Sequence, residues 1–152
     1  MNEDMAGLIR KLNLLFWGLT LPAALFLGAA YLLHRMEITV PPPAGPLRAW
    51  GIGLLVAAVA LGVAIPIVLR TLFNRAALQA GSVQPGEFAA HQKRLVAVAV
   101  SSAYVAGIGY LLLVPPLYLY GSVLAGLYGI YSAIPSERKL KAEMKFYGVR
   151  GK

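Results

Sequence analysis

The chain has 152 residues, of which 59% are hydrophobic and only 13% charged, with a mean hydropathy of +0.68 and a net charge of +8. Soluble domains carry about 25% charged residues, so most of this chain is expected to lie in lipid. The sequence contains no cysteine, which excludes disulfides, thiolate metal sites and thiol nucleophiles.

The first two uncharged runs, residues 12–33 and 49–69, each predict one transmembrane helix. They contain 22 and 21 residues, and a helix needs about 20 residues to cross a hydrocarbon core of about 30 Å. The first run also resembles a signal peptide, because Gly28-Ala29-Ala30 offers small residues for cleavage. However, the run is longer than a signal-peptide core, contains Pro22 and continues to Leu33. We therefore expect a retained helix.

The third run, residues 95–134, is 40 residues long and predicts two helices. As one helix it would extend about 60 Å, which is twice the thickness of the membrane. Pro115 and Pro116 cannot donate the backbone hydrogen bonds of a continuing helix, so they divide the run into spans 117–134 and 95–114. The alternative is one very long helix with a buried kink. The predicted fold class is an all-α integral membrane protein, a four-transmembrane-helix bundle of two helical hairpins with a short amphipathic C-terminal cytoplasmic helix.

The basic residues predict how this bundle is oriented. Twelve of the 14 lysines and arginines lie in the N-terminal segment, in residues 70–94 or in the tail 136–152, and only Arg35 and Arg48 lie in the other connection. Positive charge is retained on the cytoplasmic side of membranes. The sequence therefore predicts a plasma (inner) membrane protein, multi-pass, with N and C termini cytoplasmic. Nucleic-acid binding is the alternative explanation of the charge, but topology accounts for it better, so no nucleic acid is expected as a partner.

Two cytoplasmic segments are predicted to be helical beyond the spans. The second span continues to about Ala80, with Gly81 as its C-cap, and the third restarts near Pro85, so residues 70–94 form a helical hairpin. In the tail, Ser136 is a candidate N-cap. The side chains predicted to contact the anionic lipid surface of the inner leaflet, or a partner, are Lys139, Lys141, Lys145, Leu140, Met144 and Tyr147.

The predicted spans contain no acidic residue, lysine or arginine, with Arg70 at a boundary. Intramembrane ionisable groups usually mark proton and ion paths, so a carboxylate-coupled transporter is disfavoured. His34 and His91 lie on opposite sides of the membrane and cannot share a metal. We expect no catalytic residue, no cofactor and no metal site; an interfacial enzyme that uses His91 and Glu87 is the weakest alternative.

Small residues predict how the helices pack. Helix-packing positions recur on the fourth span and face similar residues on the third: Gly121, Ala125, Gly129, Ala133, Ala103 and Gly107. Such faces let helices approach closely in lipid. They pack the two spans of one chain, or they form a seam between copies.

Four of the polar residues inside the spans are predicted to lie close together in depth, namely Ser101, Ser102, Tyr104 and Tyr128. Reflecting the chain about the proline pair sets Tyr128 level with Ala103, so we predict that its hydroxyl bonds to one of the other three, because an unpaired hydroxyl in hydrocarbon costs a few kcal/mol.

Together these features predict a non-catalytic accessory, assembly or scaffold subunit of a larger membrane complex or homo-oligomer. Its partners would be the bilayer and other membrane protein subunits, or further copies of the chain. The alternative is a small channel or carrier for a neutral or apolar compound, whose lumen would be lined by Asn13, Thr20 and the four polar residues. A carrier requires these groups to converge on a cavity, whereas a scaffold buries them in dry contacts.

Overall fold

The computed structural model describes residues 2–36 and 44–149, and these form helices and short connections without a strand. The helices are α1 (Asn2–Arg35), α2 (Leu47–Val59), the π-helical segment η1 (Ala60–Ala64), α3 (Ile65–Ala80), α4 (Pro85–Leu111), α5 (Pro116–Ala133) and α6 (Glu137–Phe146). The predicted all-α class is confirmed. Residues 37–43, in the connection between α1 and α2, and the last three residues of the tail lie outside the described residues.

Three helices are long and apolar enough to cross a membrane: Ala6–Arg35, the continuous helix Leu47–Ala80, and Pro85–Leu111. A fourth candidate is the pair α5 and α6, which meet at a bend of 69°. The chain is therefore a multi-pass membrane protein with three or four candidate spans.

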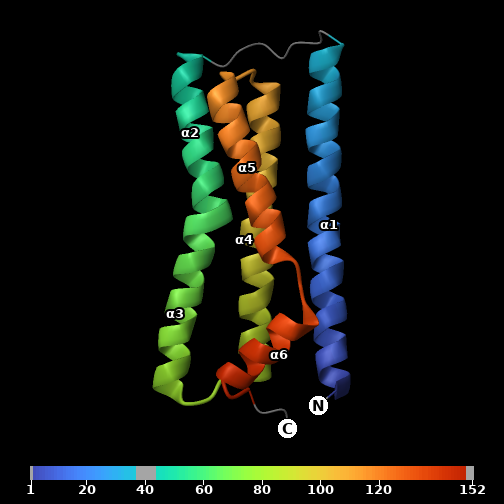
Figure 1. Ribbon diagram of the computed structural model, residues 1–152, viewed down its shortest axis with the longest axis vertical. Helices are drawn as coiled ribbons and strands as arrows, with labels where there is room; N and C mark the ends of the chain where they lie inside the picture. The colour runs from blue at the N-terminus through green and yellow to red at the C-terminus, as the bar shows by residue number, and fades with distance from the viewer. Residues whose placement is uncertain (1, 37–43, 150–152) are drawn as a thin grey trace.

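The helices lie roughly side by side, with α4 and α5 in the centre (Figure 1). Helix α1 packs against α4 on one side, while α2 and η1 pack against both α4 and α5 on the other. The N-terminus, the turn between α3 and α4, and α6 all lie at the same end of the bundle (Figure 1). We call this the basic end, because Arg10, Arg70, Arg94 and Lys139 belong to its segments.

The continuous helix Leu47–Ala80 contains a π-bulge that accommodates Pro66. The amide of Ile65 donates to the carbonyl of Ala60, five residues back, and α3 then begins with Pro66 in its first turn. A proline inside an α-helix lacks the amide hydrogen and its ring collides with the carbonyl four residues earlier. The wider π turn at Ala60–Ala64 makes room for this ring, so the helix passes the proline without breaking.

The reversal between α4 and α5 occurs at the predicted proline pair, and α5 begins at Pro116. The preceding helix ends earlier than the predicted residue 114, at Leu111. Two backbone bonds close it, from the Val114 amide to the Gly109 carbonyl (3.4 Å) and from the Leu113 amide to the Tyr110 carbonyl (3.3 Å). This is a Schellman-type ending in which Leu113 takes the left-handed position, with φ 52°.

The predicted helical hairpin at the basic end is present. Helix α3 ends at Ala80 with Gly81 at φ 71°, and α4 begins at Pro85 with Glu87 in its first turn. A core cluster lies beside this hairpin and is built around Leu12, Phe16, Val83, Phe88, Val96, Ala99, Val100, Ala133 and Leu140. The core therefore joins α1, α4, the end of α5 and α6.

Candidate functional site

The polar residues of the spans bond to helix backbone and do not form one cluster. The hydroxyl of Ser101 donates to the carbonyl of Ala97 at 2.7 Å, and that of Ser102 to the carbonyl of Ala99 at 2.6 Å. Both bonds stay within α4. A third hydroxyl, of Tyr104, donates across to α1, where it meets the carbonyl of Leu19 at 2.8 Å.

The predicted hydrogen bond of Tyr128 is wrong. Its side chain is 51% exposed on the outer side of α5, and the candidate partners Ser101, Ser102 and Tyr104 bond elsewhere. Counting residues in both directions from the proline pair predicts the depth of Tyr128 in the membrane. It does not predict the rotation of α5 about its own axis. Packing determines that rotation, because Gly126 and Gly129 occupy the side of α5 that faces α4, and Gly129 directly follows Tyr128.

The two other residues proposed for a lumen also lie apart. The hydroxyl of Thr20 is buried on α1 without a hydrogen-bond partner among the described residues. Asn13 lines a surface groove at the basic end. The six candidate lumen residues therefore do not converge on one cavity in the described part of the chain.

The small residues of α5 face two different neighbours. A methyl group added at Gly129 would lie 2.4 Å from the Ala99 carbonyl oxygen, and one at Gly126 would lie 3.1 Å from the Cα of Ala103. These positions pack against α4. Gly121 instead faces Leu55 of α2, at 2.7 Å.

The remaining predicted packing positions are buried as well. Ala125 and Ala133 are buried on α5, and Ala103 is buried on α4. Gly107 of α4 faces Phe26 of α1, with 2.5 Å between an added methyl and the ring. The small residues of α4 thus pack against both α5 and α1.

The tail helix α6 folds back on the bundle, and this corrects the prediction for its apolar side. Leu140 is 3% exposed and belongs to the core cluster, and Met144 and Tyr147 pack against it. An amphipathic pattern identifies the apolar side of a helix, but it does not say which apolar surface will cover it. Here that surface is the chain's own bundle, which buries Leu140 and partly covers Met144 and Tyr147.

Polar contacts also hold α6 in place. The amide of Gln92 on α4 donates to the Glu143 carboxylate, and the hydroxyl of Tyr147 donates to the side-chain oxygen of Asn74 on α3. Burial raises the pKa of the Tyr147 hydroxyl, and nearby Glu143 acts in the same direction, partly opposed by Arg70.

The three tail lysines have different surroundings. Lys139 is half-buried, and its ammonium donates to the Ser132 carbonyl at 3.1 Å. Lys141 is exposed and forms an ion pair with Glu137. Lys145 is exposed in the last turn of α6.

A cavity lies beneath the connection between α5 and α6, and sequence reasoning missed it. Arg70 of α3 and Lys139 of α6 both line it. Burial lowers the pKa of the Lys139 ammonium, and repulsion from Arg70 adds to this effect, partly opposed by Glu143. A signal was present in the sequence, because Arg70 directly follows one uncharged run and the connection to Lys139 directly follows another.

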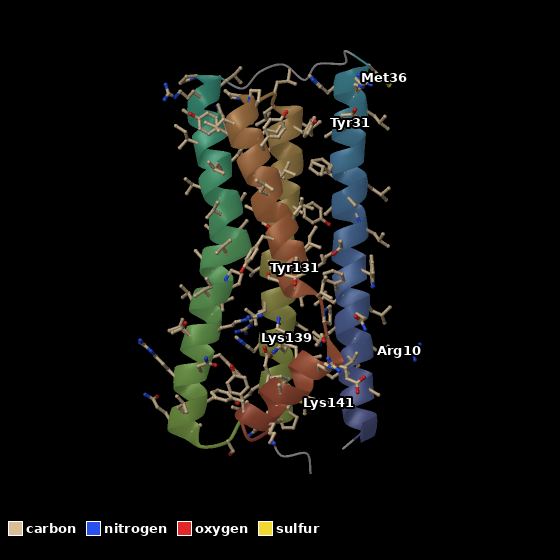
Figure 2. The ribbon with its side chains drawn as sticks, viewed as in Figure 1. Arg10, Tyr31, Met36, Tyr131, Lys139 and Lys141 are labelled. Carbon is tan, nitrogen blue, oxygen red and sulfur yellow. The ribbon has the colours of Figure 1, made fainter. Side chains whose placement is uncertain are left out.

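A second hollow is a groove between the first turns of α1 and the start of α6. It is lined by Ala6, Ile9, Arg10, Asn13, Leu14, Trp17, Glu137 and Lys141. Arg10 and Lys141 both lie in the part of the bundle that forms the basic end (Figure 2).

The histidine considered for an interfacial enzyme is stacked in the bundle. The ring of His91 lies parallel to Phe73 of α3, with 3.9 Å between ring centroids. His91 is buried, whereas Glu87, one turn earlier on α4, is exposed. No cluster of three metal-binding side chains occurs among the described residues.

Neither the protein-family models, nor the curated proteins, nor the solved structures contain a match to this chain. The geometry of the described residues is therefore what supports a function.

Proposed function

We propose that this protein is a non-catalytic four-span membrane subunit that associates with other membrane protein subunits or with further copies of itself. In this arrangement α5 is the fourth span, α6 lies at the membrane surface, and the basic end faces the cytoplasm of a plasma (inner) membrane. The excess of lysine and arginine at that end supports the orientation.

The proposal of a partner rests on the exposed side chains of α5, on the side that faces away from the bundle. Tyr128 is 51% exposed there, within an uncharged run, and its hydroxyl has no partner among the described residues. An unpaired hydroxyl in hydrocarbon costs a few kcal/mol, and hydrogen bonds between helices contribute to their association in lipid. A neighbouring subunit that accepts this hydrogen bond would remove the cost.

The rest of that side is suited to helix contact. Leu117, Tyr120, Leu124, Leu127 and Tyr131 are exposed along α5 at spacings of three and four residues. Figure 2 shows Tyr131 near the end of α5 that leads to α6. With Tyr128 these residues form a continuous strip, which we call the tyrosine strip, on a helix whose opposite side is already packed in the bundle.

The alternative of a channel or carrier receives less support. Its lumen residues would have to meet at a cavity in the middle of the membrane. Instead, Ser101, Ser102 and Tyr104 use their hydroxyls to bond to helix carbonyls, which is the dry arrangement expected of a scaffold.

The experiment is purification of the full chain in a gentle detergent or in native membrane discs, followed by native mass measurement. A mass above that of one 16.2 kDa chain, from self-association or a second subunit, is expected. Tyr128→Phe should weaken the assembly several-fold, while Tyr120→Phe, on the same strip but near the other membrane boundary, should change it less. A wild-type protein that is a lone chain under all these conditions would overturn the proposal.

A further inference from the structure

The cavity beneath the connection between α5 and α6 brings together two basic side chains from distant parts of the sequence. Arg70 enters from α3 and Lys139 from α6, and Pro135 and Ser136 of the connection complete the lining on one side. Lys139 lies at the height where α5 gives way to α6, beside α3 (Figure 2).

The cavity lies at the level where the four predicted spans have their boundaries at the basic end. Leu12, Leu95 and Ile134, which begin or end three of these spans, line it directly. Arg70 directly follows the end of the remaining span. In a bilayer this level is the boundary between hydrocarbon and headgroups, where the lipid phosphates lie.

Neither positive charge of the cavity forms a salt bridge within the described part of the chain. The Nε of Arg70 is buried and has no hydrogen-bond acceptor there. The Lys139 ammonium donates to the uncharged Ser132 carbonyl. Glu143 favours the charged form of Lys139 through space, but its carboxylate accepts a hydrogen bond from Gln92.

The N-terminus of α6, which borders the cavity, adds to the positive electrostatic potential there. Ser136 is the N-cap residue of α6 but makes no side-chain capping bond, so the first amides of this ten-residue helix lack that acceptor. The start of a helix carries partial positive charge. Glu137 lies in this first turn, but its carboxylate is exposed and pairs with Lys141.

We propose that a phosphate group binds at the mouth of this cavity, held by Arg70 and Lys139, and that the group belongs to the headgroup of an anionic lipid in the leaflet at the basic end. The cavity itself has a volume of about 20 Å³, enough for one water molecule, so the phosphate lies at its opening. An arginine guanidinium binds phosphate oxygens through its parallel N–H groups, and a lysine ammonium adds a compact positive charge. A bound phosphate neutralises the two cations and screens the repulsion between them. The inference depends on the membrane topology but not on a partner subunit, so it stands if the chain is found to be monomeric.

The test is native mass spectrometry and thermal unfolding of the purified full chain in detergent with added lipid. Phosphatidylglycerol should bind and raise the melting temperature, and phosphatidylcholine, which carries a phosphate but no net charge, should do so much less. A direct hydrogen bond to a charged group changes binding by roughly tenfold or more, so Arg70→Gln and Lys139→Gln should each lower phosphatidylglycerol binding by about that factor and the double variant by more. Equal binding by the double variant and the wild type would overturn the proposal.

Two matched variants control for the loss of charge. Arg75→Gln lies on α3 and Lys141→Gln on α6, both at exposed positions, and both should bind phosphatidylglycerol as the wild type does. Lys139→Gln also shows whether lost binding comes from misfolding. It removes the repulsion between Lys139 and Arg70, so it should fold at least as well as the wild type without lipid. If the two control variants lose as much binding as the cavity variants, general surface charge is responsible and the cavity site is refuted.

The last comparison adds inorganic phosphate in place of lipid. If the headgroup is the ligand, millimolar phosphate should not reproduce the stabilisation by phosphatidylglycerol. If phosphate alone reproduces it, and Arg70→Gln abolishes it, the phosphate site is upheld with a soluble source, and the lipid assignment is overturned.

Discussion

Tyr104 of α4 donates a 2.8 Å hydrogen bond to the carbonyl of Leu19 on α1, across 85 residues of sequence. The acceptor lies next to Gly18, whose carbonyl lacks its helical partner because Pro22 has no amide hydrogen. Because α1 packs mainly on α4, this bond fastens the first helix to the rest of the bundle.

Replacing Tyr104 with phenylalanine should therefore loosen α1. Hydrogen bonds between helices in membrane proteins contribute about 0.6 kcal/mol on average, and the buried carbonyl loses its second partner, so we expect a loss of about 1 kcal/mol. Thermal unfolding in detergent would measure it. Tyr120→Phe removes an exposed hydroxyl and should leave the melting temperature unchanged; equal effects of the two variants would contradict this role.

Gly62 should not tolerate even a methyl group. A Cβ there would lie 2.6 Å from the Ala125 carbonyl oxygen and 3.2 Å from the Ser102 hydroxyl. The first of these is backbone, which cannot move without separating η1 from α5, and overpacking of this kind costs about 1–3 kcal/mol.

The matched control for Gly62→Ala is Gly53→Ala on the same long helix, where nothing lies within 4 Å of the added methyl. Alanine favours helix over glycine by up to about 1 kcal/mol, so Gly53→Ala should be neutral or stabilising. Comparable melting temperatures for the two variants would show that the contact at η1 is not tight.

The docking of α6 depends on Leu140. Truncating a buried leucine to alanine costs about 2–5 kcal/mol, which exceeds what a ten-residue helix can withstand without packing. Leu140→Ala should raise amide hydrogen exchange throughout Glu137–Phe146 while leaving α4 protected. Phe146→Ala, at a position 67% exposed, is the control and should leave exchange as in the wild type.

Labelling of single cysteines would test the proposed topology without background, because the chain has none of its own. Cysteine at Ser82 or Lys145 should react only with reagent on the cytoplasmic side, and cysteine at Ala44 only with reagent outside. All three positions are exposed. Labelling of Ser82 and Lys145 from opposite sides would rule out the four-span arrangement.

Helix ends were predictable where one residue determines the backbone. Gly81, Pro85 and Pro116 marked the ends of α3, α4 and α5 because glycine accepts a left-handed conformation and proline fits the first helical turn. The end of α4 was misplaced because Leu113 occupies a position that usually holds glycine. Nothing in its residue type indicates that conformation.

The directions of side chains were less predictable, since they depend on contacts between distant segments. The rotation of α5 follows from how Gly126 and Gly129 meet α4, and it sends Tyr128 outward against expectation. Likewise, the cavity of Arg70 and Lys139 requires α6 to turn back on the bundle. The hydropathy of the sequence predicts the depth of Arg70 and Lys139 relative to the membrane. It does not predict that both side chains lie on the same side of the bundle.

The extra residue of the π-bulge sets the angular phase of everything that follows it on the second long helix. Each residue advances an α-helix by about 100°, so deletion of one residue within Ala60–Ala64 would swing Arg70 by that angle around its axis. Lys139 would then line the cavity without Arg70. The one-residue π-bulge beside Pro66 thus determines the direction of the Arg70 guanidinium, about a turn and a half further along the helix.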